Sequence, residues 1–149
     1  MADLTLTITE AVTLNGSARG STNTKTVAGI NHVMHRIVTC PVGQSTTVAV
    51  FNTNTYSAAG AIDTENVRHI RITNLDSSNA VFLGLVGASD NYQIELSAGM
   101  SHMLPGANGV MLGEEDTTPA FASLESLVSI VCRPTASATV QVEIFVASV

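Results

Sequence analysis

The sequence contains few aromatic and few charged residues. Its 149 residues include no tryptophan, two tyrosines and four phenylalanines, and only 12% are charged. Six Lys and Arg stand against 12 Asp and Glu, which gives a formal net charge of -6 at pH 7. Proteins that bind nucleic acid without sequence preference neutralise phosphates with many basic side chains. The composition therefore argues against nucleic-acid binding and favours a basic partner over an acidic one.

The chain also lacks long apolar runs and recognisable targeting signals. No run approaches the 18 or more apolar residues of a membrane span, so no membrane partner is expected. The opening MADLTLTITEAV has neither a basic n-region nor an uninterrupted apolar h-region, so we do not expect a secretory signal. The two cysteines, Cys40 and Cys132, lie far apart in the sequence. Without an export signal we expect buried free thiols, with a disulfide as the alternative.

Aliphatic residues must supply the core. Hydrophobic residues make up 45% of the chain although aromatics are only 4%, so we expect a core of Val, Ile, Leu, Ala and Met. A chain of this length is expected to form one domain and to bury about 68 to 70% of its unfolded surface. The low charge indicates either that other subunits cover part of the surface or that the solvent face is rich in Thr, Ser and Asn.

The stretch from Val67 to Leu104 has the plainest β-pattern. In VRHIRITN, the apolar residues Ile70 and Ile72 recur with the period of two that a strand requires. The polar turns LDSSN and GASDN then separate the runs AVFLGLV, YQIEL and MSHML. This pattern predicts a meander of three or four antiparallel strands.

The rest of the chain is also predicted to be β. Thr26–Thr39 matches helical spacing passably, but its β-branched residues favour a strand with a bend near Gly29–Asn31. Further strands are expected over residues 3–9, 44–52, 109–112, 124–133 and 139–146. Eight to ten short strands with frequent turn signals are typical of an all-β sandwich or barrel. Within that class we favour a single-domain, antiparallel, jelly-roll-like β-sandwich spanning residues 1–149.

Residues 1–25 are predicted to form an N-terminal arm, consisting of a strand and a flexible loop. Three apolar residues of DLTLTIT alternate with threonines, which is typical of a half-buried strand, and Asn15-Gly16 then signals a turn. We expect the polar stretch Asn15–Lys25 to be a mobile loop. The strand either pairs with a neighbouring subunit or forms an ordinary edge of its own domain. The interface candidates in this arm are Leu4, Leu6, Ile8, Arg19 and Lys25.

The sequence offers little support for catalysis or a cofactor. A strand would place His32 and His35 on opposite faces, which prevents a shared metal site, and would separate Ser101 from His102 in the same way. The chain contains no GxSxG elbow, P-loop or dinucleotide-binding fingerprint. His69 is expected to pair with a neighbour or to lie at a subunit contact. We therefore predict no enzyme activity and no cofactor.

The strongest local charge feature is the acidic triplet formed by Glu114, Glu115 and Asp116. Clustered carboxylates suit calcium, but the triplet lacks the alternating ligand spacing of a dedicated calcium loop. It is interpreted as a solvated loop or a contact with a basic partner, with cation binding as the alternative. Tyr56, in a second polar loop, is a further interface candidate.

The whole-chain pattern resembles small virion structural proteins of tailed bacteriophages. The resemblance rests on VRHIRITNLDSSNAVFLGLV followed by YQIELSAGMSHML, and on the opening DLTLTITEAVTLNG with the later AGINHVMHRIV. It covers most of the chain but depends on β-patterns rather than on residues with a chemical role.

The resemblance implies a virion subunit, assembled in the host cytoplasm, that oligomerises as a trimer and contacts the major capsid protein or other virion proteins. Its expected role is decoration and cementing of the head. The alternatives are a tail or tail-fibre component, or a module that binds host glycans through its loops; Tyr56 and Tyr92 are the plausible rings for the last role.

Overall fold

The computed structural model describes residues 1–114 and 118–149, and its regular secondary structure is almost entirely β-strand. The first six strands are β1 (Ala2–Thr9), β2 (Val12–Leu14), β3 (Ser17–Arg19), β4 (Thr22–Ile30), β5 (His32–Cys40) and β6 (Thr46–Val50). A short 3-10 turn, η1 (Thr55–Ser57), precedes the others, which are β7 (Val67–Asn74), β8 (Val81–Val86), β9 (Asn91–Leu96), β10 (Ser101–Leu104), β11 (Ser129–Pro134) and β12 (Val140–Ser148).

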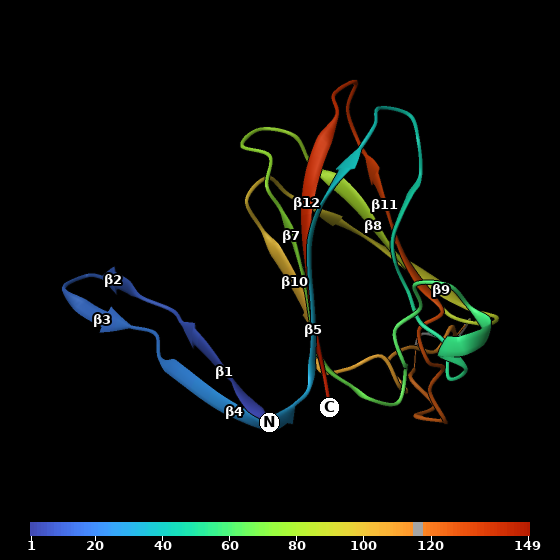
Figure 1. Cartoon of the computed structure of the whole chain (residues 1–149). Coiled ribbons are helices and arrows are strands. Elements are labelled where there is room, and N and C mark those ends of the chain that lie inside the picture. The colour runs from blue at the N-terminus through green and yellow to red at the C-terminus, as the bar shows by residue number, and fades with distance from the viewer. Residues whose placement is uncertain (115–117) are drawn as a thin grey trace.

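Strands β5 to β12 form a jelly roll. They pair as a nested series, β5 with β12, β6 with β11, β7 with β10 and β8 with β9, and every pair is antiparallel. Rolling up this series adds the β12–β7 and β11–β8 pairs. The result is a first sheet, β10-β7-β12-β5, packed against a second sheet, β6-β11-β8-β9 (Figure 1). The predicted antiparallel, jelly-roll-like sandwich is therefore confirmed.

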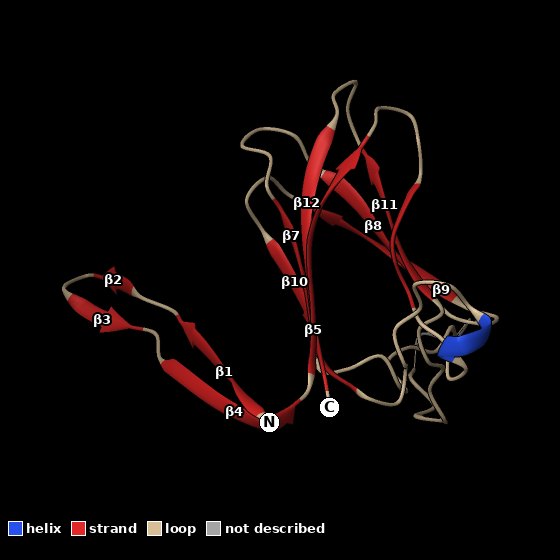
Figure 2. Cartoon of the chain, viewed as in Figure 1, coloured by secondary structure: helices blue, strands red, loops and turns tan. Residues whose placement is uncertain are grey.

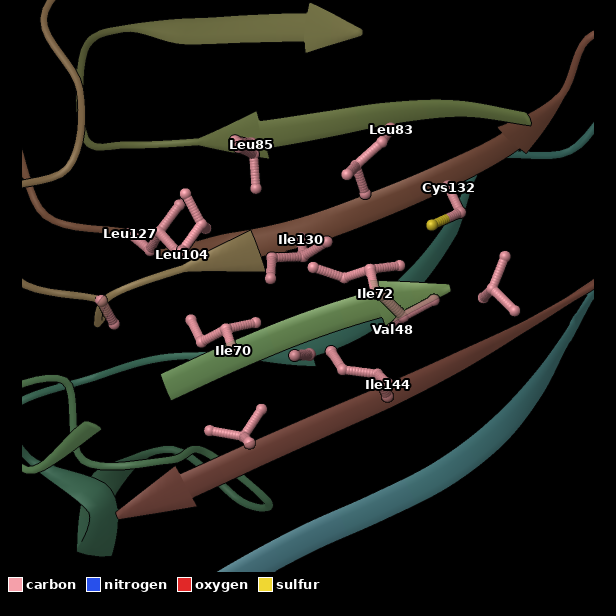
Figure 3. Close-up of a cluster of buried hydrophobic side chains, with 14 of the residues drawn as sticks. Val48, Ile70, Ile72, Leu83, Leu85, Leu104, Leu127, Ile130, Cys132 and Ile144 are labelled. Carbon is pink, nitrogen blue, oxygen red and sulfur yellow. The ribbon is translucent and has the colours of Figure 1, made fainter. Parts of the chain in front are cut away.

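The core lies between the two sheets and is aliphatic, as the composition predicts. Alternate residues of the central strands point inward, among them Ile70 and Ile72 on β7 and Leu83 and Leu85 on β8 (Figure 3), and all four are fully buried. Burial of a side chain of this size stabilises the fold by about 1.5 to 3 kcal/mol. Cys132 lies in the same cluster, and both cysteines are buried free thiols, as expected.

The predicted meander is wrong in two of its three connections. Strands β8 and β9 form the expected hairpin, but β7 and β8 lie in different sheets, as do β9 and β10. Asn74, at the end of β7, shows why the first connection crosses the sandwich. Its buried amide donates to the carbonyl oxygens of Asn79 (2.9 Å) and Leu96 (3.0 Å), which ties the crossing loop to the second sheet.

Three other expectations can be compared with the strands. The bend near Gly29–Asn31 is confirmed, because β4 ends at Ile30, β5 begins at His32 and Gly29 has a φ of +79°. The short strand expected over residues 109–112 is wrong, since Met111 makes only an isolated bridge to Glu125. The strand expected over residues 124–133 begins only at Ser129.

The first four strands form a narrow ribbon that projects from the sandwich, called here the N-terminal ribbon (Figures 1 and 2). Strand β1 pairs with β4, and β2 pairs with β3 at the far end. The expectation of a loop over Asn15–Lys25 is wrong, because most of this stretch belongs to β3 and β4. At the root, Asn31 N donates to Ser148 O (2.9 Å), which attaches the ribbon to the end of β12.

Candidate interaction surface

The N-terminal ribbon reverses at the predicted Asn15-Gly16 turn. Asn15 has a φ of +50° and Gly16 a φ of +76°, so both central residues adopt the left-handed conformation. A tight two-residue hairpin turn requires positive φ at both central residues, and Asn-Gly adopts this conformation with little backbone strain. The local sequence thus positions the tip of the ribbon.

The two faces of the ribbon differ in chemistry. On one side, called the apolar face, Leu4, Leu6 and Ile8 of β1 alternate along the strand, and Leu4 lies opposite Val27 of β4. The other side, called the threonine face, consists of three directly opposed pairs, Thr5 with Thr26, Thr7 with Thr24 and Thr9 with Thr22. The hydroxyls of the last two pairs lie 3.4 and 3.3 Å apart. Cross-strand threonine pairs of this kind stabilise an antiparallel ribbon.

The apolar face is not covered by the sandwich. Leu4 and Leu6 are only half-buried, and Ile8 is 45% exposed. Towards the tip, the exposed fractions rise to 57% at Val12 and 61% at Leu14. A two-stranded ribbon is marginally stable by itself in water. Cover from another molecule would therefore stabilise this surface.

The ribbon differs from the sandwich in charge. Residues 1–30 contain two acidic and two basic side chains, the latter being Arg19 and Lys25. Residues 31–149 contain ten acidic and four basic side chains and so hold the whole net charge of -6. Arg19 lies opposite Val12, Lys25 lies opposite Leu6, and both basic side chains are exposed. The ribbon is thus a neutral surface that projects from an acidic body.

Two further interface candidates, Tyr56 and Glu114, lie away from the ribbon. Tyr56 belongs to η1 and is 90% exposed, on the opposite side of the sandwich from the ribbon (Figure 2). The Glu114 carboxylate accepts a hydrogen bond from the backbone N of Ala120 (3.0 Å). Glu115 and Asp116 lie outside the described residues. Among the candidates that lie in the described residues, the structure brings together the five of the arm.

A second surface, the outer face of the first sheet, was not predicted from the sequence. The Glu143 carboxylate on β12 accepts hydrogen bonds from Arg71 of β7 (2.5 Å) and His35 of β5 (2.9 Å). The hydrogen bond from Arg71 holds the pKa of Glu143 below its usual range, and the bond from His35 acts in the same direction. Arg71 also donates to the Thr73 hydroxyl.

Apolar side chains surround this network. Val33 and Ile37 flank His35 on the outer face and are 48% and 60% exposed. The Phe145 ring lies between those of His35 and His69, at 6.1 Å from each. The period-two alternation of β5 and β12 was visible in the sequence, but it does not reveal that His35, Phe145 and Arg71 share one row of the sheet.

Ser101 and His102, considered above as a catalytic pair, contact different partners. The Ser101 hydroxyl lies 2.7 Å from that of Thr73, whereas the His102 ring lies 3.3 Å from the Tyr92 hydroxyl. No group of three His, Cys, Asp or Glu side chains within residues 1–114 and 118–149 is arranged to hold a metal ion. Exposed apolar surface is consequently the most prominent feature available for function.

Comparisons with known proteins identify no relative. No family model matches the chain, and neither a curated protein nor a solved structure matches it. In the part of the chain that the structure describes, no helix is long and apolar enough to cross a membrane.

Proposed function

We propose that this protein is a non-enzymatic decoration subunit of a tailed-bacteriophage head, and that it acts as a homotrimer whose ribbons hold it to neighbouring subunits and to the major capsid protein. The observation that supports this proposal is the projecting ribbon with its uncovered apolar face. A compact jelly roll provides a rigid body, and the ribbon extends the reach of each subunit beyond that body.

Burial of the apolar face supplies the attachment energy. Full burial of a Leu, Ile or Val side chain contributes about 1.5 to 3 kcal/mol, and the half-buried Leu4 and Leu6 have only part of that left to gain. One ribbon therefore binds weakly by itself. In a trimer, three ribbons attached to one body engage together, and their combined affinity greatly exceeds that of one. Weak individual contacts combined in this way suit a cement subunit.

Charge favours the ribbon as the contacting element. The acidic bodies of two copies repel each other at long range, whereas the neutral ribbon meets no such opposition. The basic side chains Arg19 and Lys25 additionally suit the acidic body of a neighbouring copy. The proposed subunit contact thus pairs a ribbon with a body rather than a body with a body.

The copy number in purified particles tests the assignment to the head. Quantitative mass spectrometry should give about one copy per major capsid protein, or a number that matches the local three-fold positions of the shell. A handful of copies per particle would overturn head decoration and would place the protein on the tail.

Ribbon variants test the mode of attachment. Leu6→Thr removes apolar area from the apolar face, and we expect at least a tenfold weaker attachment to particles that lack the protein. The matched control is Thr7→Ser, on the threonine face of the same strand, which should attach normally. Both variants should melt at the wild-type temperature because the core is untouched. Equal attachment of the two variants would contradict the role of the apolar face.

A host-glycan binding module is the second candidate. Tyr92 and Phe121 line a cavity together with Met111 and Leu124, and Glu114 contributes a carboxylate. Sugar rings stack on aromatic side chains beside such polar groups. Binding on a glycan array that is lost in Tyr92→Ala would favour this candidate, and an array without binding would remove it.

A further inference from the structure

The two cysteines, 92 positions apart in the sequence, meet in the core. Cys40 is the last residue of β5 in the first sheet, and Cys132 lies on β11 in the second sheet. Both are 0% exposed and belong to the same buried cluster, and strands β5 and β11 are in contact with each other. The two thiols are close enough for each to shift the pKa of the other. They are the only cysteines of the chain.

The path of the chain explains why Cys40 and Cys132 lie close together. After Cys40 the chain crosses from the first sheet to the second through residues 41–45, and β6 begins at Thr46. Thr46 is the direct cross-strand partner of Cys132. After the Cys132 thiol, the Thr46 side chain also lowers the pKa of Cys40, so it lies beside that thiol as well. The crossing therefore brings both thiols next to Thr46, where the chain passes from one sheet to the other.

Burial keeps oxidants away from the reduced pair, because both thiols are 0% exposed. The neighbouring Cys40 thiol and burial raise the pKa of Cys132, whereas the neighbouring Cys132 thiol lowers the pKa of Cys40, so Cys40 is the thiol that loses its proton more readily. Because an oxidant must reach the Cys40 sulfur, oxidation requires transient opening of the sandwich near the crossing. Cys40, at the end of its strand beside the turn at residues 41–45, becomes accessible first.

We propose that Cys40 and Cys132 are the site of an intrachain disulfide that links the two sheets when a disulfide oxidant such as glutathione disulfide reaches them. The Cys40 thiol loses its proton and attacks one sulfur of the oxidant, which releases one glutathione thiolate and forms a mixed disulfide. The Cys132 thiolate then attacks the Cys40 sulfur and releases the second glutathione. Two protein thiols are oxidised, one glutathione disulfide is reduced, and the two released protons end on glutathione.

The cross-link would enclose most of the jelly roll. The closed loop runs from residue 40 to residue 132 and includes β6 to β11, so the bond restricts the unfolded chain strongly. Stabilisation of the typical size for a native disulfide raises the melting temperature of a domain of this length by about 5 to 15 °C. The same chain thus folds as a dithiol and becomes more heat-resistant after oxidation. This inference does not depend on the proposed function.

The test incubates the purified full chain with glutathione disulfide, both at 25 °C and a few degrees below its melting temperature. We expect the intact mass to fall by two hydrogens without a retained glutathione, a Cys40–Cys132 peptide in a non-reducing digest, and a higher melting temperature that dithiothreitol reverses. The variants C40A and C132A should form at most a glutathione adduct and should show no such rise.

Two free thiols after prolonged incubation near the melting temperature would overturn the proposal. Exclusive formation of glutathione adducts or of disulfide-linked dimers would overturn it as well. Because the reversible rise is measured on the wild-type chain, the test does not depend on whether the alanine variants fold.

Discussion

Gly20 lies directly against the backbone of Glu10 in the bend of the N-terminal ribbon. A Cβ atom at Gly20 would lie 2.1 Å from the Glu10 carbonyl oxygen, and Gly20 has a φ of +117°. Both the contact and the backbone conformation exclude a larger residue. Next to this contact, Glu10 N donates to Ser21 O (2.9 Å) and continues the pairing of β1 with β4.

The first prediction is that Gly20→Ala disorders the outer half of the ribbon and leaves the sandwich intact. We expect at least tenfold faster tryptic cleavage after Arg19 and Lys25, which flank the bend, and a melting temperature within about 2 °C of the wild type. The matched control is Gly16→Asn, because the Gly16 position is left-handed but open, and Asn tolerates that conformation. Cleavage of Gly20→Ala at the wild-type rate would contradict the importance of this contact.

The ribbon illustrates what the sequence could and could not reveal. The alternation of Leu4, Leu6 and Ile8 and the Asn15-Gly16 turn were read correctly because they are local patterns. The first four residues of β4, residues 22–25, were predicted to be a loop because they are polar on both faces of the strand. Polar residues can still form a strand here, since the threonine face supplies cross-strand partners that only the paired structure reveals.

Local sequence patterns also could not predict which strands pair in each sheet, because these partners are distant in the sequence. A polar connection of six residues between β7 and β8 suits a hairpin as well as a crossing between sheets. Long-range pairing decides between them, since β12 occupies one side of β7 and β10 occupies the other. The same limit applies to the contact between Cys40 and Cys132, because it depends on where the chain changes sheets.

The second prediction concerns Asn74, which is fully buried at the crossing from β7 to β8. Asn74→Ala removes the donor for the carbonyl oxygens of Asn79 and Leu96, and also the acceptor for the backbone N of Asp76. Leaving buried backbone groups unpaired should lower the free energy of unfolding by about 3 kcal/mol, and the melting temperature by about 6 to 12 °C. Urea denaturation measures the first quantity directly. Asn91→Ala, at an exposed position on β9, is the control and should cost less than about 0.5 kcal/mol.

The third prediction concerns the carboxylate shared by Arg71 and His35. Glu143→Gln should lower the free energy of unfolding by about 1 kcal/mol at pH 7, because the charged hydrogen bond from Arg71 is lost from a side chain that is 20% exposed. The pKa of Glu143 is lowered in the folded state, so its stabilisation is present above the ordinary value of 4.5 and is lost as the pH falls through the folded-state pKa.

Denaturation of the wild type and Glu143→Gln at pH 7, 5 and 3 checks this prediction. The two proteins should differ at pH 7 and converge towards pH 3. Glu95→Gln, which changes an exposed side chain on β9, is the control for the loss of one negative charge. A difference that persists unchanged at pH 3 would show that Glu143 stabilises the fold by packing rather than by its charge.

The fourth prediction follows from the burial of His69 on β7. Its side chain faces the Phe145 ring, and the residue is only 5% exposed. Burial lowers the pKa of His69, and repulsion from Arg71 acts in the same direction. The unfolded chain therefore binds a proton at this residue more readily than the folded chain does. The free energy of unfolding is therefore not reduced by His69 above pH 6.5, the ordinary pKa of histidine. It falls as the pH drops below that value, because the unfolded chain is then protonated first.

We expect His69→Asn to flatten the dependence of unfolding free energy on pH between 7 and 5, whatever its effect on stability at pH 7. Part of the slope should remain, because burial also lowers the pKa of His102. His32→Asn, at an exposed position at the start of β5, should keep the wild-type slope. If His69→Asn and the wild type lose stability in parallel from pH 7 to pH 5, the folded protein protonates His69 as readily as the unfolded chain. The outer face of the first sheet would then have to open around Phe145 to hydrate the imidazolium.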